Sequence, residues 1–180
     1  MKMKLTLLAM AVGALVAFAA PVAQANLMWS EEGEFTVEGE FSVQNAGPTL
    51  VNGPCPVELS GSATESGTQI EGGSGGPCGT NFGFCSIEEL SFSALPWAAS
   101  SSTSDIVTLS NGTFTIHYTA GCAALGLPSN VSAAGTGSGT FNLETQCATA
   151  VNAEGLKLEA NNAPLTVNGE ACIASGPVLT

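Results

Sequence analysis

Basic residues are scarce in this chain. Lysine and arginine together number three in 180 residues, and two of them are Lys2 and Lys4. From residue 26 onward Lys157 stands against 15 acidic residues, which gives a net charge of −14. Proteins that bind nucleic acid rely on clusters of Lys and Arg to neutralise phosphates. The scarcity of these residues therefore excludes nucleic acid as a partner.

The residue patterns of common catalytic and metal centres are also missing. The chain has one histidine, His117, and one aspartate, Asp105, and it contains no Cys-x-x-Cys pair. These residues do not supply the Cys and His ligands of a zinc site, and no serine stands on a strand-to-helix elbow of the Gly-x-Ser-x-Gly type. We therefore predict no catalytic residue, no metal site and no cofactor, and we predict that the protein is not an enzyme.

The first 25 residues have the features of a cleaved signal peptide. Lys2 and Lys4 precede an apolar run from Leu5 to Ala20, and Ala23-Gln24-Ala25 gives the small-x-small pattern of a cleavage site. No later run approaches the roughly 20 apolar residues that span a bilayer. We therefore predict one secreted domain over residues 26–180, exported through the periplasm and without a transmembrane segment.

All six cysteines follow the predicted cleavage site. An even number of cysteines in an exported chain predicts three disulfides. Spacing does not select among the possible pairings, and our working assignment joins Cys55 to Cys85, Cys122 to Cys172, and Cys78 to Cys147.

Alternating side chains predict an all-β fold. In the segment 34–43, Phe35, Val37, Phe41 and Val43 alternate with polar residues, as in a half-buried strand. No segment keeps apolar residues at helical spacing over three turns. Short strands separated by Gly, Asn and Pro predict an antiparallel β-sandwich, immunoglobulin-like or related, that is stapled by disulfides.

The clearest local signal is Asn111-Gly112, which lies between two alternating runs within residues 105–119. This dipeptide favours a type I′ turn and predicts a β-hairpin. In that hairpin His117 points away from the core and Asp105 lies on the opposite face, which argues against a Ser-His-Asp triad.

Segments rich in small residues are predicted to connect the strands. The runs 72–77, 98–104 and 133–139 are predicted as loops or linkers, and 123–128 as a short turn or half-helix.

Two groups of large apolar residues are candidates for contact with an apolar ligand or surface. The candidates are Phe82, Phe84, Leu95, Trp97, Leu125 and Leu127. Trp97 ends a predicted core strand that begins at Cys85, and we interpret it as a core side chain rather than a ligand platform. Leu125 and Leu127 are better candidates for exposure, because loops run over the surface.

Several short motifs resemble a known family. They are Phe-Thr-Val-x-Gly at residues 35–39, Leu95-Pro96-Trp97 after a strand that follows a cysteine, Cys122, and the closing segment from Asn161-Asn162-Ala163 to Cys172-Ile173-Ala174-Ser175-Gly176. In these the chain resembles the secreted bacterial protein activators of alkane oxidation, which are small exported β proteins.

The resemblance implies an extracellular accessory protein without catalytic residues. Its role would be to promote the use or dispersal of water-insoluble hydrocarbon, and its partner would be hydrocarbon or another apolar interface. An alternative is a structural or adhesive surface subunit that self-associates by strand addition, based on the alternating strand near the mature N-terminus.

Overall fold

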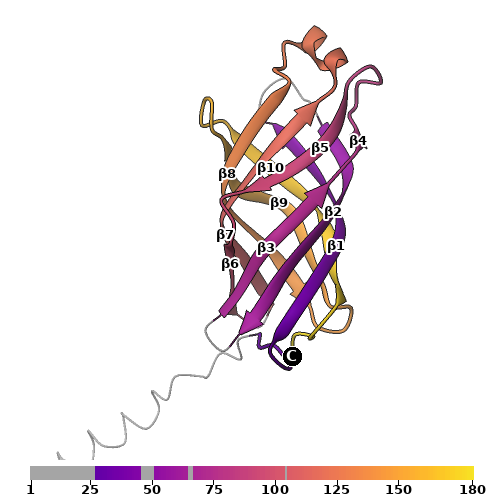
Figure 1. Cartoon of the computed structure of the whole chain (residues 1–180). Helices are drawn as coiled ribbons and strands as arrows, with labels where there is room; N and C mark the ends of the chain where they lie inside the picture. The colour runs from indigo at the N-terminus through magenta and orange to yellow at the C-terminus, as the bar shows by residue number, and fades with distance from the viewer. Residues whose placement is uncertain (1–26, 46–50, 65–66, 104) are drawn as a thin grey trace, which may run out of the picture.

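In the computed structural model, a single antiparallel sheet closes on itself into a barrel (Figure 1). The structure describes residues 27–45, 51–64, 67–103 and 105–180, so the predicted signal peptide lies outside the described residues. The elements are β1 (Gly33–Asn45), β2 (Val51–Thr64), β3 (Gly67–Gly75), β4 (Cys78–Gly79), β5 (Ser86–Ser93), β6 (Trp97–Thr103), β7 (Ile106–Tyr118), the 3₁₀ helix η1 (Ala120–Leu125), β8 (Asn130–Asn142), β9 (Cys147–Leu158) and β10 (Pro164–Ser175).

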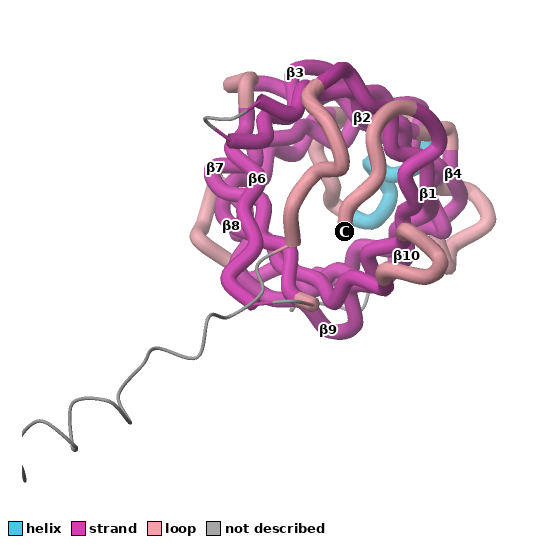
Figure 2. Tube along the Cα trace, turned by 90° about the horizontal axis from the view of Figure 1, so that it is seen from below, coloured by secondary structure: helices cyan, strands magenta, loops and turns pink. Residues whose placement is uncertain are grey.

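The prediction of a β-sandwich is wrong, although the all-β prediction is confirmed. β1 pairs with β2 on one side and with β10 on the other, and β2 also pairs with β3. β5 and β6 share one position in the wall, because both lie between β3 and β7. The sheet therefore closes with eight strand positions instead of dividing into two sheets. Figure 2 shows the resulting ring in a view along the barrel.

Side-chain alternation fits this closed wall. In β1, Phe35 and Val43 are buried inside the barrel, whereas Glu34, Glu38 and Glu40 are exposed on the outside. A closed wall gives every strand one inner and one outer face, and the period of two sorts apolar and polar residues between them. The half-buried strand predicted at 34–43 is therefore confirmed.

The hairpin predicted at Asn111-Gly112 is wrong. Both residues lie within the single strand β7, which pairs with β8 throughout its length. The pairing shifts register between Leu109 and Gly112, and Asn111 has φ 60°, so the dipeptide forms a bulge in a continuous strand. Asn-Gly accommodates a positive φ both in a turn and in a bulge. Which of the two forms depends on the strand that pairs with this segment. His117 does point away from the core, as predicted, and its neighbours are described below.

Three segments predicted as loops or linkers are largely strands. Residues 72–75 belong to β3, residues 98–103 to β6 and residues 133–139 to β8. Gly and Ala have low strand propensity, but that propensity reflects the packing of side chains on neighbours. Inside a narrow barrel the small residues leave room for large side chains across the interior. The short helical turn predicted at 123–128 corresponds to η1, which begins three residues earlier.

The two ends of the barrel differ. At one end lie η1 and the connection from β4 to β5, as the top of Figure 1 shows. At the other end Met28 and Thr180 exchange backbone hydrogen bonds, and Trp29 stacks on Phe35 at 4.6 Å between ring centroids. The Gln146 side chain bonds to the backbone of Leu179 in both directions, at 3.0 and 2.8 Å. The two terminal segments are thus joined to the barrel at this end.

The three predicted disulfides are present, but the working assignment of partners is wrong. The pairs are Cys55–Cys78, Cys85–Cys122 and Cys147–Cys172, in place of Cys55–Cys85, Cys122–Cys172 and Cys78–Cys147. Cys147 and Cys172 are directly opposite in the β9–β10 ladder, and this register could not be read from the sequence. Disulfides are typical of proteins outside the cytosol. Within the described residues, no helix is long and apolar enough to cross a membrane.

Replacing Gly112 by alanine distinguishes a bulge from a hairpin turn. Gly112 does not have a positive φ, and an added Cβ would meet its first neighbour, the carbonyl oxygen of Gly135, at 3.6 Å. We therefore expect Gly112→Ala to raise the free energy of unfolding by about 0.4–1 kcal/mol, because alanine restricts the unfolded chain. In a type I′ turn the same change would cost about 1 kcal/mol or more, because the second turn residue needs a positive φ. Urea denaturation measures whether Gly112→Ala raises or lowers the free energy of unfolding.

Candidate functional site

His117 belongs to a hydrogen-bonded chain on the outer wall. Its Nε2 lies 2.7 Å from Oγ of Ser91, and its Nδ1 lies 2.8 Å from Oδ1 of Asn130. Because the amide oxygen only accepts, Nδ1 donates to Asn130, and Nε2 and the serine hydroxyl share the second hydrogen bond. The order of the three groups is that of a Ser-His-Asn triad. Sequence reasoning missed it because the partners come from β5 and β8, which the hairpin prediction did not place beside His117.

The serine of this chain lies in the middle of the sheet and not on a strand-to-helix elbow. Ser91 pairs with both Ser74 and Thr115, so its backbone stands between two strands of the wall. An oxyanion hole needs free N–H groups aimed at the nucleophile's reaction centre, and neighbouring strands occupy such groups here. Ser74 occupies a Gly-x-Ser-x-Gly pattern at residues 72–76, but it lies in strand β3 and not on a strand-to-helix turn.

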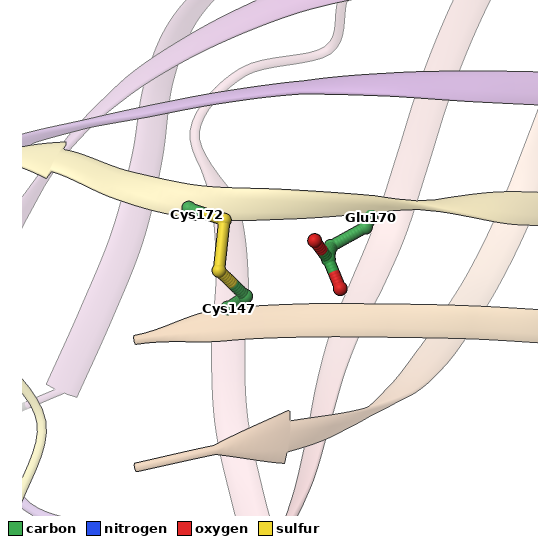
Figure 3. A group of neighbouring side chains, drawn as sticks. All are labelled: Cys147, Glu170 and Cys172. Carbon is green, nitrogen blue, oxygen red and sulfur yellow. A yellow bond between two sulfur atoms is a disulfide. The ribbon is translucent and has the colours of Figure 1, made fainter. Parts of the chain in front are cut away.

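Cys147, Glu170 and Cys172 are the one cluster of potential metal ligands found among the described residues. Figure 3 shows the two sulfur atoms joined in a disulfide and Glu170 beside them. Metal binding by cysteine requires thiolates, and a disulfide has none. Glu170 instead accepts a hydrogen bond of 3.1 Å from the Thr149 hydroxyl. The two cysteines of the cluster therefore form a disulfide that links β9 to β10.

The end of the barrel that carries η1 presents two exposed aromatic rings. Phe82 is 36% exposed and Phe84 is 57% exposed, and their ring centroids lie 6.1 Å apart. Both residues belong to the connection between Cys78 and Cys85, and these cysteines bond to Cys55 and Cys122. A loop held by a disulfide on each side keeps its exposed rings in place.

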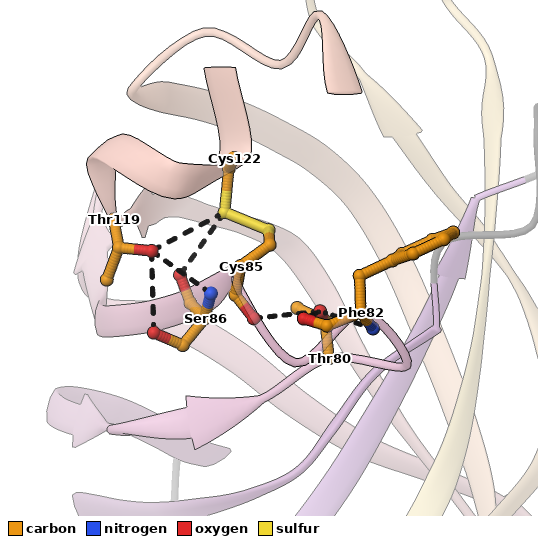
Figure 4. Close-up of a disulfide and its surroundings, with 6 residues drawn as sticks. All are labelled: Thr80, Phe82, Cys85, Ser86, Thr119 and Cys122. Carbon is orange, nitrogen blue, oxygen red and sulfur yellow. Dashed lines mark hydrogen bonds between the residues drawn. A yellow bond between two sulfur atoms is a disulfide. The ribbon is translucent and has the colours of Figure 1, made fainter. Parts of the chain in front are cut away.

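Local hydrogen bonds shape the same loop (Figure 4). The Thr80 hydroxyl lies 3.0 Å from the carbonyl oxygen of Phe82 and 2.9 Å from that of Cys85, and it accepts the N–H of Phe82 at 3.1 Å. Gly121 of η1 lies directly against the carbonyl of Phe84, where a Cβ would not fit. We call residues 79–84 together with η1 the apolar cap.

The connections at the two ends of the barrel differ in charge. Residues 76–85 and 118–130 contain no charged side chain. The remaining described connection at this end, between β9 and β10, contains one carboxylate, Glu159. At the opposite end the described connections carry four, at Glu31, Glu32, Asp105 and Glu144. Exposed apolar residues occur there too, such as Met28 and Val178.

The six predicted apolar-contact residues differ in their exposure to solvent. Phe82 and Phe84 are exposed on the apolar cap, whereas Leu125 and Leu127 are half-buried and pack against the core. Leu95 is half-buried and also packs on the core. Trp97 is buried, and its Nε1 donates to the carbonyl of Ser93 at 2.8 Å, which confirms its interpretation as a core side chain.

Comparison with protein families identifies the chain. The model of the alkane oxidation protein activator PraA/PraB-like family matches residues 1–178. The chain belongs to this family. The match confirms the resemblance seen in the short motifs from Phe35 to Gly176. Comparison with curated proteins gives no match, and neither does comparison with solved structures.

Removing one disulfide at a time tests its role in holding the apolar cap. We expect the double variants C85A/C122A and C147A/C172A to lose similar stability in urea, about 3–4 kcal/mol each, because their sequence separations of 37 and 25 residues are comparable. Only C85A/C122A should speed amide hydrogen exchange in residues 80–85 and 120–125 under native conditions. Equal exchange in the two variants would show that the Cys85–Cys122 bond does not hold the cap.

Proposed function

We propose that this protein is a non-catalytic, exported accessory protein that promotes the use or dispersal of water-insoluble hydrocarbons. In this proposal the apolar cap touches the hydrocarbon and the acidic remainder stays in water. The family description, an activator of alkane oxidation, supports the link to hydrocarbons. The three disulfides and the predicted signal peptide support export.

The observation that carries the proposal is the exposed ring pair in a connection, residues 76–85, that has no charged side chain. Moving an apolar ring from water to oil releases about 25 cal/mol per Å². Moving a carboxylate with it would cost several kcal/mol. Phe82 and Phe84 can enter an oil surface without such a cost, because residues 76–85 carry no charge. The exposed carboxylates on the other end and on the outer wall favour an end-on orientation.

The alternative, a surface subunit that assembles by strand addition, has weaker support. Its basis was the alternating strand at 34–43, and this strand, β1, is paired on both sides within its own chain. Strand addition needs an unpaired edge. Size-exclusion chromatography tests this alternative, since a subunit that assembles in this way would form polymers.

Replacing the two exposed rings tests the proposed function. We expect F82S/F84S to bind a hexadecane surface at least about tenfold more weakly, because the exposed area of two rings contributes several kcal/mol. Pendant-drop tensiometry measures the fall in interfacial tension, and circular dichroism checks the fold. The matched control M28S/V178S removes side chains that are 67% and 42% exposed at the acidic end, and it should behave as the wild type.

A charged residue placed between the two rings is an independent test of the proposed function. Gly83 does not have a positive φ, and a Cβ there would meet no atom within 4 Å, so G83E should fold. It keeps both rings but adds a carboxylate that must stay hydrated, so it should weaken adsorption as F82S/F84S does. Wild-type protein that leaves the interfacial tension unchanged, or a control that loses as much as F82S/F84S, would contradict the proposed function.

A further inference from the structure

A cavity of about 200 Å³ lies inside the barrel. Strands β1, β2 and β5 to β10 all contribute to its lining. Protein interiors are close-packed, with few voids larger than a water molecule. A void of this size therefore requires an explanation in the sequence.

The cavity has a wall of rings and a wall of small residues. Phe41, Phe92, Trp97 and Phe114 supply the rings, from β1, β5, β6 and β7. Elsewhere in the lining, β8 and β9 present small residues, which include Gly137, Gly139, Ala148 and Ala150. The space exists because, apart from Leu156, these two strands add little side-chain volume to the lining.

Gly137 marks the empty space most directly. It is paired with Leu109, whose side chain lines the cavity, so the two residues share the inner face. A Cβ built on Gly137 would meet no atom within 4 Å, and its φ is not in the left-handed region. A larger side chain could therefore stand at this position without strain. The chain has glycine where the backbone does not demand it.

The lining selects a ligand without polar groups. Apart from Ser138, every lining side chain is apolar or absent. The indole N–H of Trp97 is already bonded to Ser93. A ligand with a hydroxyl or carboxyl group inside this cavity would lose its hydrogen bonds to water and gain none. Ser138 is exposed on the outside of β8 and also borders the cavity.

Size narrows the class of ligand further. An apolar cavity of about 150 Å³ stays dry and admits benzene. The present cavity is larger, at about 200 Å³, and fits one small hydrocarbon or the end of one alkyl chain. Barrels with eight strands are also just wide enough to enclose one small ligand.

We propose that the barrel binds a single small saturated hydrocarbon, or the end of one alkyl chain, in this cavity. The binding site is distinct from the apolar cap. This extends the proposed function from contact with a hydrocarbon surface to the binding of single molecules, and its choice of hydrocarbon rests on that proposed function. Either site can fail in experiment without the other.

Filling the cavity from Gly137 tests the proposal, with n-octane as the probe. Wild-type protein equilibrated with n-octane should take up one molecule per chain in saturable fashion and unfold at a higher temperature. G137L should fold, unfold at a higher temperature than the wild type without ligand, and bind octane at least about tenfold more weakly. The matched control T136L adds the same side chain on the exposed, outer side of β8 and should bind octane as the wild type does.

Further variants make each outcome decisive. If G137L does not fold, G137A adds one methyl group in the empty space and should lower the affinity for octane relative to pentane about tenfold. F82S/F84S should keep octane binding, and G137L should keep interfacial activity, which separates the two sites. No saturable octane uptake by the wild type, or uptake by G137L and G137A equal to that of the wild type, would overturn the proposal.

Discussion

Closure of the sheet is the constraint on which the rest of the structure depends. The pairing of β2 with β3, together with that of β1 with β10, converts a row of strands into a wall with an inside and an outside. Each residue of the wall then faces either a narrow interior or water. The acidic residues of β1 and the rings that meet in the interior are consequences of this single division.

The interior of the wall combines large and small side chains. Rings come from β1 and β5 to β7, whereas β8 and β9 supply mostly Gly and Ala to the lining. If all strands carried large side chains, the barrel would be overpacked, and if all carried small ones, it would lose the apolar area that stabilises it. The combination gives a stable wall and a central space. The ends are fixed separately, by disulfides and η1 at the apolar cap and by the Trp29 and Gln146 contacts at the other.

Much of the local structure could be predicted from the sequence, but its closure could not. The alternation at Phe35 to Val43, the core position of Trp97 and the formation of three disulfides all follow from residue type and spacing. Whether strands close into a barrel or form two sheets depends on which strand pairs with β1, and side-chain alternation is the same in both folds. The disulfide partners and the Ser91–His117–Asn130 chain depend likewise on which other strands lie side by side, such as β5, β7 and β8. The cavity was missed because the glycines of β8 were interpreted as a loop.

The pairing of the first described strand with the last bears on how the chain folds. Residues 36–45 of β1 pair on one side with residues 165–175 of β10, so this seam joins segments from opposite ends of the polypeptide. Contacts of such long range form slowly. The wall therefore stays open at this seam until β10 has been synthesised, although β1 already has its other neighbour, β2, close by in the sequence.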